Sequence, residues 1–457
     1  MNLSMKRILV TALFLTTSVL AWCQSEWYGV YIKDKKAGYV TFDQKDDARG
    51  HYVESVSVLG GKILGSALEI KVTSRTWSNA RGELTRMEVD SQSGGKVQKM
   101  LAVVSGGKIE ASSTMDGRTT KKTIEIPAGA AIIDDPMTMF MKGDAPREVY
   151  VIDSNTLGLV KCSPVNLGTE KLKTAAGEVE ATVIDMQDPR SPLKVYLSKK
   201  GDVLKAVGPF GMEIRPVTKA VALGASDGAD IADASSVTPN HPIPDFLQTK
   251  TLTLKISGHD LGHIPSDAHQ TVSKKGDSWV LTIHPVQPDD VKVTSGAAPG
   301  DQWTKPDQRI PSDSARFRKQ AKEIVGTEHG LLERVEKLRT FVQGQVRANA
   351  GIGVLRDADD ILDSGEGVCR DHAILLATLL RADDVPTRLV SGMVYANGAF
   401  YYHAWVEVWT GSGWMGVDST RPTKGLDATH IKVAEGTVSD VFTSFLLDGI
   451  SIEVVDP

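Results

Sequence analysis

Cysteine is scarce in this chain, with only Cys23, Cys162 and Cys369 among 457 residues. So low a count excludes the dense disulfide framework that holds many small exported domains together. Beyond the first 23 residues, the sequence also lacks any apolar run long enough to cross a bilayer. We therefore expect ordinary hydrophobic cores, and no transmembrane span once an N-terminal leader has been removed.

A surplus of positive charge is missing as well. The chain has 52 Lys and Arg against 57 Asp and Glu, which gives a formal net charge of -5. Proteins that bind nucleic acid or anionic membranes by electrostatic attraction usually carry a basic surplus. We therefore expect no nucleic-acid partner.

The N-terminus has the features of a secretory leader. A basic pair precedes the apolar run Ile8 to Leu20, and small residues follow. We predict that residues 1–23 are a signal peptide, and cleavage after Ala21 or after Cys23 both remain open. The bulky Trp22 stands where a lipoprotein signal needs a small residue. The expected location is therefore the periplasm or the medium, with lipid anchoring the less favoured alternative.

The rest of the chain divides by composition. Residues 24–223 read as short alternating strands separated by turn residues, without a catalytic constellation, and predict a β-rich domain that is structural or holds a substrate or envelope partner. Residues 224–245 are small, acidic and proline-bearing, as in a linker. Residues 246–300 predict a small β module, and residues 301–457 a domain that combines helices and strands.

Four histidines fall in the small β module and raise the question of a metal: His259, His263, His269 and His284. They have no cysteine partner and no helical His-Glu-x-x-His arrangement. We interpret them as scattered surface histidines and expect no metal site.

The pattern becomes helical after Ser314, a suitable cap for a helix with Phe317 and Ala321 on its apolar face. A second apolar face begins at Leu331, after Gly326. Both patterns predict helices whose apolar faces pack in a core, and we assign no catalytic residue to them.

Cys369 lies between a glycine-rich turn and an apolar helical run that ends before Pro386. A thiol in the first turn of a helix faces unpaired N–H groups and the positive end of the helix dipole, both of which favour the thiolate. Cys162 lies in a strand-like run, and we expect a small buried residue there rather than a disulfide partner. Cysteine at a helix start is more often inert, so a functional interpretation of Cys369 needs further residues.

Those residues follow downstream on a predicted hairpin. His403 lies in the strand-like segment 400–409 and shares a face with Trp405, and a tight turn leads to the strand that ends at Asp418. Such a hairpin can hold His403 beside Asp418. A nucleophile with a base, and a base with an orienting carboxylate, is the logic of a catalytic triad.

In their order and spacing, these blocks closely resemble the transglutaminase-like superfamily, of papain-like fold, in its bacterial secreted form. The similar blocks, within about residues 310–457, are Gly367-Val368-Cys369-Arg370-Asp371-His372-Ala373, Val385-Pro386-Thr387-Arg388, His403-Ala404-Trp405-Val406-Glu407-Val408 and Asp418-Ser419-Thr420. Asp384 replaces a usual glycine and Ser419 a common proline. Neither departure removes a catalytic atom.

The resemblance implies an α+β fold, with helices packed on an antiparallel sheet, and a triad of Cys369, His403 and Asp418. Cys369 would attack an amide of a protein or peptide, and an amine or water would resolve the thioester, without a metal or organic cofactor. A cysteine peptidase and a non-catalytic protein-binding module that retains the fold are the alternatives.

Other residues around the thiol receive weaker expectations. The backbone N–H of Cys369 is a candidate oxyanion donor, because it lies at a helix start. The candidates for a second donor, which the sequence does not rank, are Gln343, Gln345 and Asn349. We expect Asp371 to bind free N–H groups of the first helical turn, and Glu366 to face solvent or Arg370.

Overall fold

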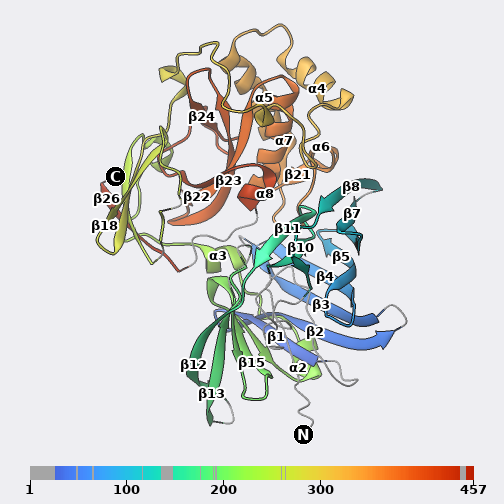
Figure 1. Ribbon diagram of the computed structural model, residues 1–457. Helices are drawn as coiled ribbons and strands as arrows, with labels where there is room; N and C mark the ends of the chain where they lie inside the picture. The colour runs from blue at the N-terminus through green and yellow to red at the C-terminus, as the bar shows by residue number, and fades with distance from the viewer. Residues whose placement is uncertain are drawn as a thin grey trace. The chain divides into compact units, whose positions relative to one another are not determined.

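The structure is a computed structural model (Figure 1). It describes residues 26–47, 50–63, 66–115, 117–134, 148–174, 177–188, 190, 193–258, 260–262, 264–442 and 449–456. The predicted signal peptide, residues 1–23, lies outside the described residues. Within them, no helix combines the length and apolar character needed to cross a membrane.

The chain forms two compact units. Unit 1 comprises residues 1–234 and 351–354, and unit 2 comprises residues 235–350 and 355–457. The division at residue 234 falls inside the segment 224–245, for which we predicted a linker.

Unit 1 confirms the predicted β-rich N-terminal region. Its main sheet has 13 strands in the order β12-β13-β14-β15-β16-β1-β2-β3-β4-β5-β6-β7-β8, and neighbouring strands pair antiparallel. The bounds are β1 (Glu26–Ile32), β2 (Lys35–Asp47), β3 (Gly50–Ile63), β4 (Ser66–Ser78), β5 (Leu84–Ser93), β6 (Lys96–Ser105), β7 (Lys108–Met115), β8 (Arg118–Glu125), β12 (Val165–Thr174), β13 (Gly177–Asp185), β14 (Lys194–Leu197), β15 (Val203–Val207) and β16 (Met212–Pro216). A smaller sheet contains β9 (Ala131–Ile132), β10 (Val149–Asp153) and β11 (Gly158–Cys162), and the short helices are α2 (Lys219–Leu223) and α3 (Ile231–Ser235).

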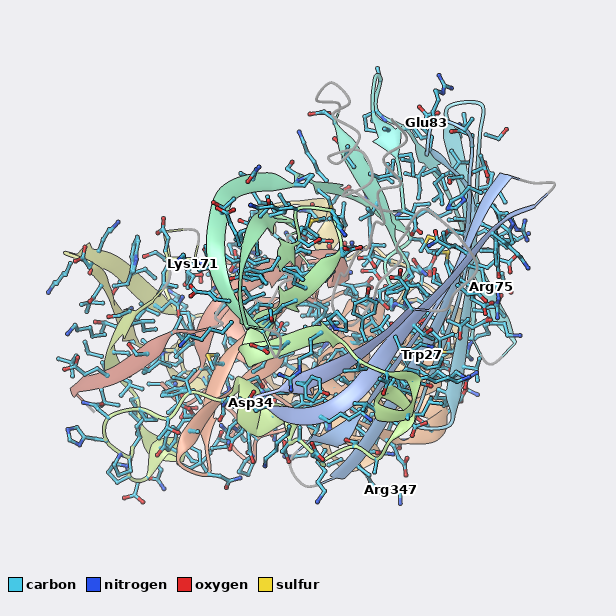
Figure 2. All side chains as sticks on the ribbon, turned by 90° about the horizontal axis from the view of Figure 1, so that it is seen from below. Trp27, Asp34, Arg75, Glu83, Lys171 and Arg347 are labelled. Carbon is cyan, nitrogen blue, oxygen red and sulfur yellow. The ribbon has the colours of Figure 1, made fainter. Side chains whose placement is uncertain are left out.

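Alternation along the strands explains why this sheet forms. On β4, Leu68, Ile70 and Val72 are buried in one apolar cluster. The intervening residues are exposed, as expected for a period of two. Farther along β4, Arg75 (labelled in Figure 2) pairs with Glu54 and Asp90 on the two neighbouring strands. Surface pairs of this kind add little stability, so the apolar face holds the sheet together.

Cys162 ends β11 as a buried free thiol, as predicted for a small buried residue. Burial raises the pKa of this thiol to about 12, and the nearby Asp188 carboxylate adds to the effect. Cys369 is also free. The chain therefore keeps its two described cysteines as thiols.

Unit 2 has helices packed on an antiparallel sheet, which confirms the predicted α+β class. The sheet order is β24-β23-β22-β25. Its elements are β22 (Thr387–Ala396), β23 (Ala399–Trp409), β24 (Trp414–Val417) and β25 (Ile431–Gly436), and the helices are α4 (Ala315–Val325), α5 (Leu331–Gln345), α6 (Ala358–Ser364), α7 (Cys369–Ala382) and α8 (Val438–Phe442).

Helix α7 is the centre of this unit (Figure 1), and from Asp371 to Ala382 every residue is buried. Its apolar residues share one core with α4, α5 and α6 and with Ala404, Val406 and Val408 of β23. Ser314 caps α4 as predicted, because its hydroxyl accepts a hydrogen bond from Phe317 N–H at 3.3 Å. This packing fixes the end of α7 that carries Cys369.

The strands of the predicted small β module do not form a sheet of their own, because a strand from the end of the chain completes it. Its strands, β17 (Leu252–Ser257), β18 (Gln270–Lys275) and β19 (Ser278–Ile283), join the C-terminal β26 (Ser451–Asp456) in a sheet of order β18-β19-β17-β26. Strand β17 pairs with β19 along one edge and with β26 along the other, where Leu254 lies opposite Val454. Because an unpaired edge leaves backbone groups without partners, this long-range pairing ties the strands of 246–300 to the end of the chain.

Candidate active site

The start of α7 is held in place by hydrogen bonds around the turn before Cys369. The carboxylate of Asp371 accepts the Val368 N–H at 2.9 Å, which confirms its predicted role at the first helical turn. The guanidinium of Arg356 lies 3.4 Å from Asp371 Oδ2 and donates to the Glu366 carbonyl at 2.6 Å. Arg356 and Asp371 are both fully buried, so they form a rigid support for Cys369.

The side chain of Glu366 is partly exposed to solvent, as expected, but its polar partners are Asn349 and Arg347. It accepts from the Asn349 amide at 2.9 Å and pairs with Arg347 at 3.2 Å. The reason is a short parallel pairing of β20 (Arg347–Ala348) with β21 (Glu366–Gly367), which brings these side chains together.

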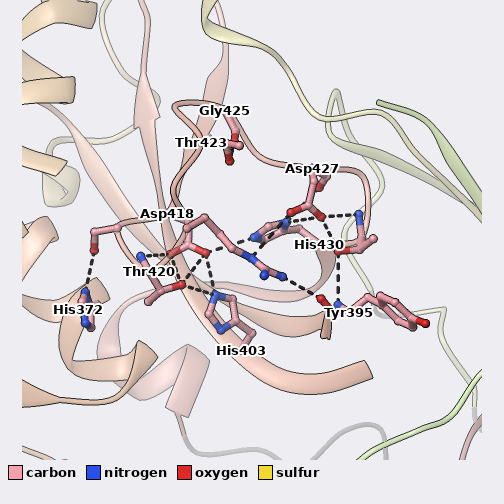
Figure 3. A network of polar contacts seen from close by, with 12 residues as sticks. His372, Tyr395, His403, Asp418, Thr420, Thr423, Gly425, Asp427 and His430 are labelled. Atoms are coloured by element: carbon pink, nitrogen blue, oxygen red, sulfur yellow. Dashed lines mark hydrogen bonds and ion pairs between the residues drawn. The ribbon is translucent and has the colours of Figure 1, made fainter. Parts of the chain in front are cut away.

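His403 and Asp418 meet as the hairpin predicts. Strand β23 pairs with β24 so that Val406 lies opposite Val417, and residue 418 therefore falls beside the part of β23 that carries His403. The distance from His403 Nε2 to Asp418 Oδ2 is 2.8 Å, and both side chains are buried (Figure 3). A carboxylate can only accept, so Nε2–H donates and Nδ1 is the ring nitrogen that remains for the thiol.

The surroundings favour the charged form of His403. Burial lowers its pKa, but the Asp418 charge and hydrogen bond, together with a hydrogen bond to the Cys369 thiol, outweigh burial and raise the pKa to about 10. The structure thus brings Cys369, His403 and Asp418 together. A thiol beside a protonated imidazole is suited to forming and releasing a thioester.

Asp418 is stabilised as a carboxylate by several donors. Thr420 gives its backbone N–H at 2.7 Å and its hydroxyl at 2.8 Å to Asp418 Oδ1. On the other side, His430 Nε2 lies 3.3 Å from Oδ2 (Figure 3). Burial raises the pKa of Asp418, but His403 and His430 hold it well below its ordinary value of 3.8.

An indole covers both imidazoles. Trp405 is buried and stacks on His403, with ring centroids 6.2 Å apart, and it meets His430 edge-on at 5.2 Å. Such packing excludes water from the His403–Asp418 pair and strengthens its electrostatic interaction.

The three side chains considered as second oxyanion donors all have other acceptors. Gln343 donates to the Arg421 carbonyl at 2.7 Å, Gln345 to the Leu362 carbonyl at 3.2 Å, and Asn349 to Glu366. Any of them would have to give up its hydrogen bond to serve an oxyanion.

The interpretation of the four histidines as surface residues is wrong for His269. This side chain is buried, and its Nε2–H donates to the His430 carbonyl at 2.7 Å. Burial lowers the pKa of His269 to about 4, so the ring is neutral. His284 is exposed as expected, and His259 and His263 lie outside the described residues.

Two side-chain groups among the described residues have the donor types of a metal site. In the first, Asp267, Glu407 and Glu435 surround the Lys432 ammonium, which lies 2.9 Å from Glu407 and 2.8 Å from Glu435. This lysine already supplies the cation. The second group is His403, Asp418 and His430, whose facing atoms are hydrogen-bonded to one another. We therefore interpret both groups as hydrogen-bonded ion clusters.

Two residues of the site, Thr420 and His430, were not identified from the sequence. Nothing in the spacing of Thr420 or His430 along the sequence assigned either residue a contact with Asp418. The available signal was a polar residue two positions after the carboxylate, the usual spacing of an Asx turn. No local signal identified His430, which is 12 residues from Asp418.

Residues 318–419 match the family model of the transglutaminase-like superfamily. An uncharacterized protein from Mycobacterium leprae (strain TN) is 32% identical over 106 residues, which are 21% of this chain and 37% of that protein. The chain thus spans little more than a third of that curated relative.

Two solved structures are similar to parts of the chain. A candidate cysteine protease from Cytophaga hutchinsonii gives a TM-score of 0.32 at 19% identity, over 46% of this chain and 87% of its own. A beta-barrel-like protein with a domain of unknown function, from Brucella abortus, gives 0.33 at 10% identity, over 42% and 95%. From the family match, residues 318–419, which include Cys369, His403 and Asp418, are a transglutaminase-like domain.

Proposed function

We propose that this protein is an exported cysteine acyltransferase or amidohydrolase that forms a thioester on Cys369 from an amide of a protein or peptide. One observation carries the proposal: the His403 ring is hydrogen-bonded at Nε2 to Asp418, at 2.8 Å, and the Cys369 thiol is near enough to help raise the pKa of that ring. A nucleophile, an acid–base group and an orienting carboxylate are the parts that acyl transfer requires.

In the proposed first half-reaction, the Cys369 thiolate attacks the amide carbon. The sulfur–carbon bond forms, the carbon–nitrogen bond breaks, and His403 gives its proton to the leaving amine. The N–H of Cys369, at the start of α7, is placed to stabilise the oxyanion.

In the second half-reaction, an amine or water attacks the thioester and gives a proton to the now neutral His403. The sulfur–carbon bond breaks and restores the thiolate and the imidazolium. Throughout, Asp418 stabilises the charged ring and holds its Nε2–H, as its place beside His403 requires.

Export is part of the proposal and rests on the leader-like sequence of residues 1–23. We further propose that the β-rich unit 1 positions a protein substrate or an envelope partner. Its main support is the absence of a catalytic constellation in the sequence 24–223, which leaves binding or structure as its role.

The function is tested by offering the mature protein a glutamine peptide with and without a primary amine, and measuring products by mass. We expect either the amine adduct or, from hydrolysis, a gain of about 1 Da as the amide becomes an acid. Cleavage of the peptide backbone would instead identify a peptidase. Failure to turn over a broad peptide library would contradict an enzyme and favour a binding module.

A further inference from the structure

His430 lies deep in unit 2 and contacts Asp418 from the side opposite to Thr420 (Figure 3). It is fully buried, yet both of its ring nitrogens have hydrogen-bond partners. Nε2 lies 3.3 Å from Asp418 Oδ2, and Nδ1 lies 3.0 Å from the Asp427 carbonyl and 3.3 Å from Asp427 Oδ1. Each of these partners is an oxygen that accepts.

Both carboxylates that face His430 are ionised. Asp427 Oδ1 accepts the Thr429 N–H at 3.0 Å and also the Thr429 hydroxyl. Burial raises the pKa of Asp427, but His430 and Thr429 outweigh it and the net effect lowers the pKa. Asp418 is likewise held as a carboxylate by Thr420 and His403. A neutral imidazole has only one N–H, so it would leave one of these contacts without a proton.

His269 provides a contrast within the same cluster. It too is a buried imidazole beside Trp405, with ring centroids 6.3 Å apart, but its Nε2–H has a single carbonyl acceptor. Its pKa is lowered by burial to about 4. The pKa of His430 is lowered by burial too, but hydrogen bonds to Asp418 and Asp427 reverse the direction and raise it.

We propose that His430 is a protonated positioning residue, an imidazolium between Asp418 and Asp427 that holds the Asp418 carboxylate and, together with His403, balances the charge of that carboxylate. This role deepens the proposed function, because it concerns the same site. His430 lies beyond residues 318–419, the range that matches the family model of the superfamily.

The titratable and charged groups around His430 come from four parts of the chain. Asp418 follows β24, Asp427 lies in the next loop with Arg421 3.8 Å from its Oδ2, His403 lies on β23 with its ring centroid 5.8 Å away, and His269 precedes β18. Two carboxylates and two imidazolium ions therefore alternate from Asp427 to His403. In this arrangement His430 offsets part of the Asp418 charge that acts on His403.

The test uses the full chain labelled with ¹⁵N at its 10 histidines and an NMR titration between pH 5 and 9. The His430→Gln variant assigns the His430 resonances. We expect both ring nitrogens of His430 to carry a proton at pH 7, whereas His269 keeps the signals of a neutral ring with one N–H. A neutral His430 at pH 7, or a metal ion bound stoichiometrically at this ring, would overturn the proposal.

The free energy of unfolding, measured as a function of pH, is a second test, because a residue with a purely structural role would not change its pH dependence. A group with a raised pKa holds a proton in the folded chain that the unfolded chain releases above about pH 6.5. The stability lost in His430→Gln should therefore be largest below that pH and shrink as pH rises, by up to tenfold in the folding equilibrium constant per pH unit. The matched control is His269→Gln, whose deficit should stay constant above pH 6.5; a constant deficit for His430→Gln would contradict the proposal.

The positioning role is tested by the NMR signal of His403. Without the second imidazolium, more of the Asp418 charge acts on His403, so its Nε2–H proton resonance should move downfield in His430→Gln and stay in place in His269→Gln. If His430→Gln does not fold, Asp427→Asn weakens the same charge and should let His430 lose its proton at a lower pH. An unmoved His403 resonance would overturn the role. None of these readouts needs turnover, so they stand or fall separately from the proposed activity.

Discussion

Replacing Cys369 by alanine is expected to reduce acyl transfer by about 10⁶-fold, because no other group can form the thioester. The readout is product formation from the glutamine peptide, by mass, for the wild type and the variant. Cys369 begins α7 and is only partly buried, so loss of its sulfur should leave the fold intact.

The chain supplies a matched control in its other described cysteine. Cys162 is buried at the end of β11 in unit 1, and burial raises its pKa to about 12, so it is a poor nucleophile. The Cys162→Ala variant should retain full activity. Turnover that survives in Cys369→Ala and disappears in Cys162→Ala would refute the assignment of the nucleophile.

Asp418→Asn should lower kcat by about 10⁴-fold, the size of loss seen when a triad carboxylate becomes an amide. The amide removes the charge that keeps His403 protonated, and its N–H group can force the wrong ring tautomer. With Asp418 in place, the pKa of His403 is raised to about 10, so the imidazolium is retained up to that pH.

The direction of the pH effect follows from the same pKa. Without the carboxylate, the pKa of His403 should fall from about 10 towards its ordinary value of 6.5, and the alkaline limb of kcat/KM should move to lower pH. Rates measured from pH 5 to 10 on both proteins test this. An alkaline limb that keeps its position in Asp418→Asn would show that Asp418 does not support the charge on His403.

Local patterns explain how much of the domain was predictable. The cap at Ser314, the helix that begins at Cys369 and the β23–β24 hairpin all depend on neighbours within a few residues. Because the hairpin register is set locally, the sequence alone predicts that His403 lies beside Asp418. The broad apolar face of α7 was enough to predict that this helix is buried, with the Cys369 thiol at its first turn.

What could not be predicted depends on contacts between distant parts of the chain. Strand β17 pairs with β26, almost 200 residues later in the sequence, and no pattern in either strand predicts this pairing. His269 was predicted to be a surface residue, yet its ring is buried and donates a hydrogen bond to the distant His430 carbonyl. Asp384, in place of a usual glycine, adopts φ +58, so a left-handed turn is kept there without glycine.

The central claim, that His403 activates the Cys369 thiol, is tested most directly by the rate of thiol alkylation across pH in the wild type and in His403→Ala. An unperturbed thiol loses its reactivity below about pH 8.5. We expect the wild-type protein to keep reacting at Cys369 well below that pH, and His403→Ala to lose this reactivity. An ordinary thiol profile in the wild type, unchanged in His403→Ala, would contradict the account.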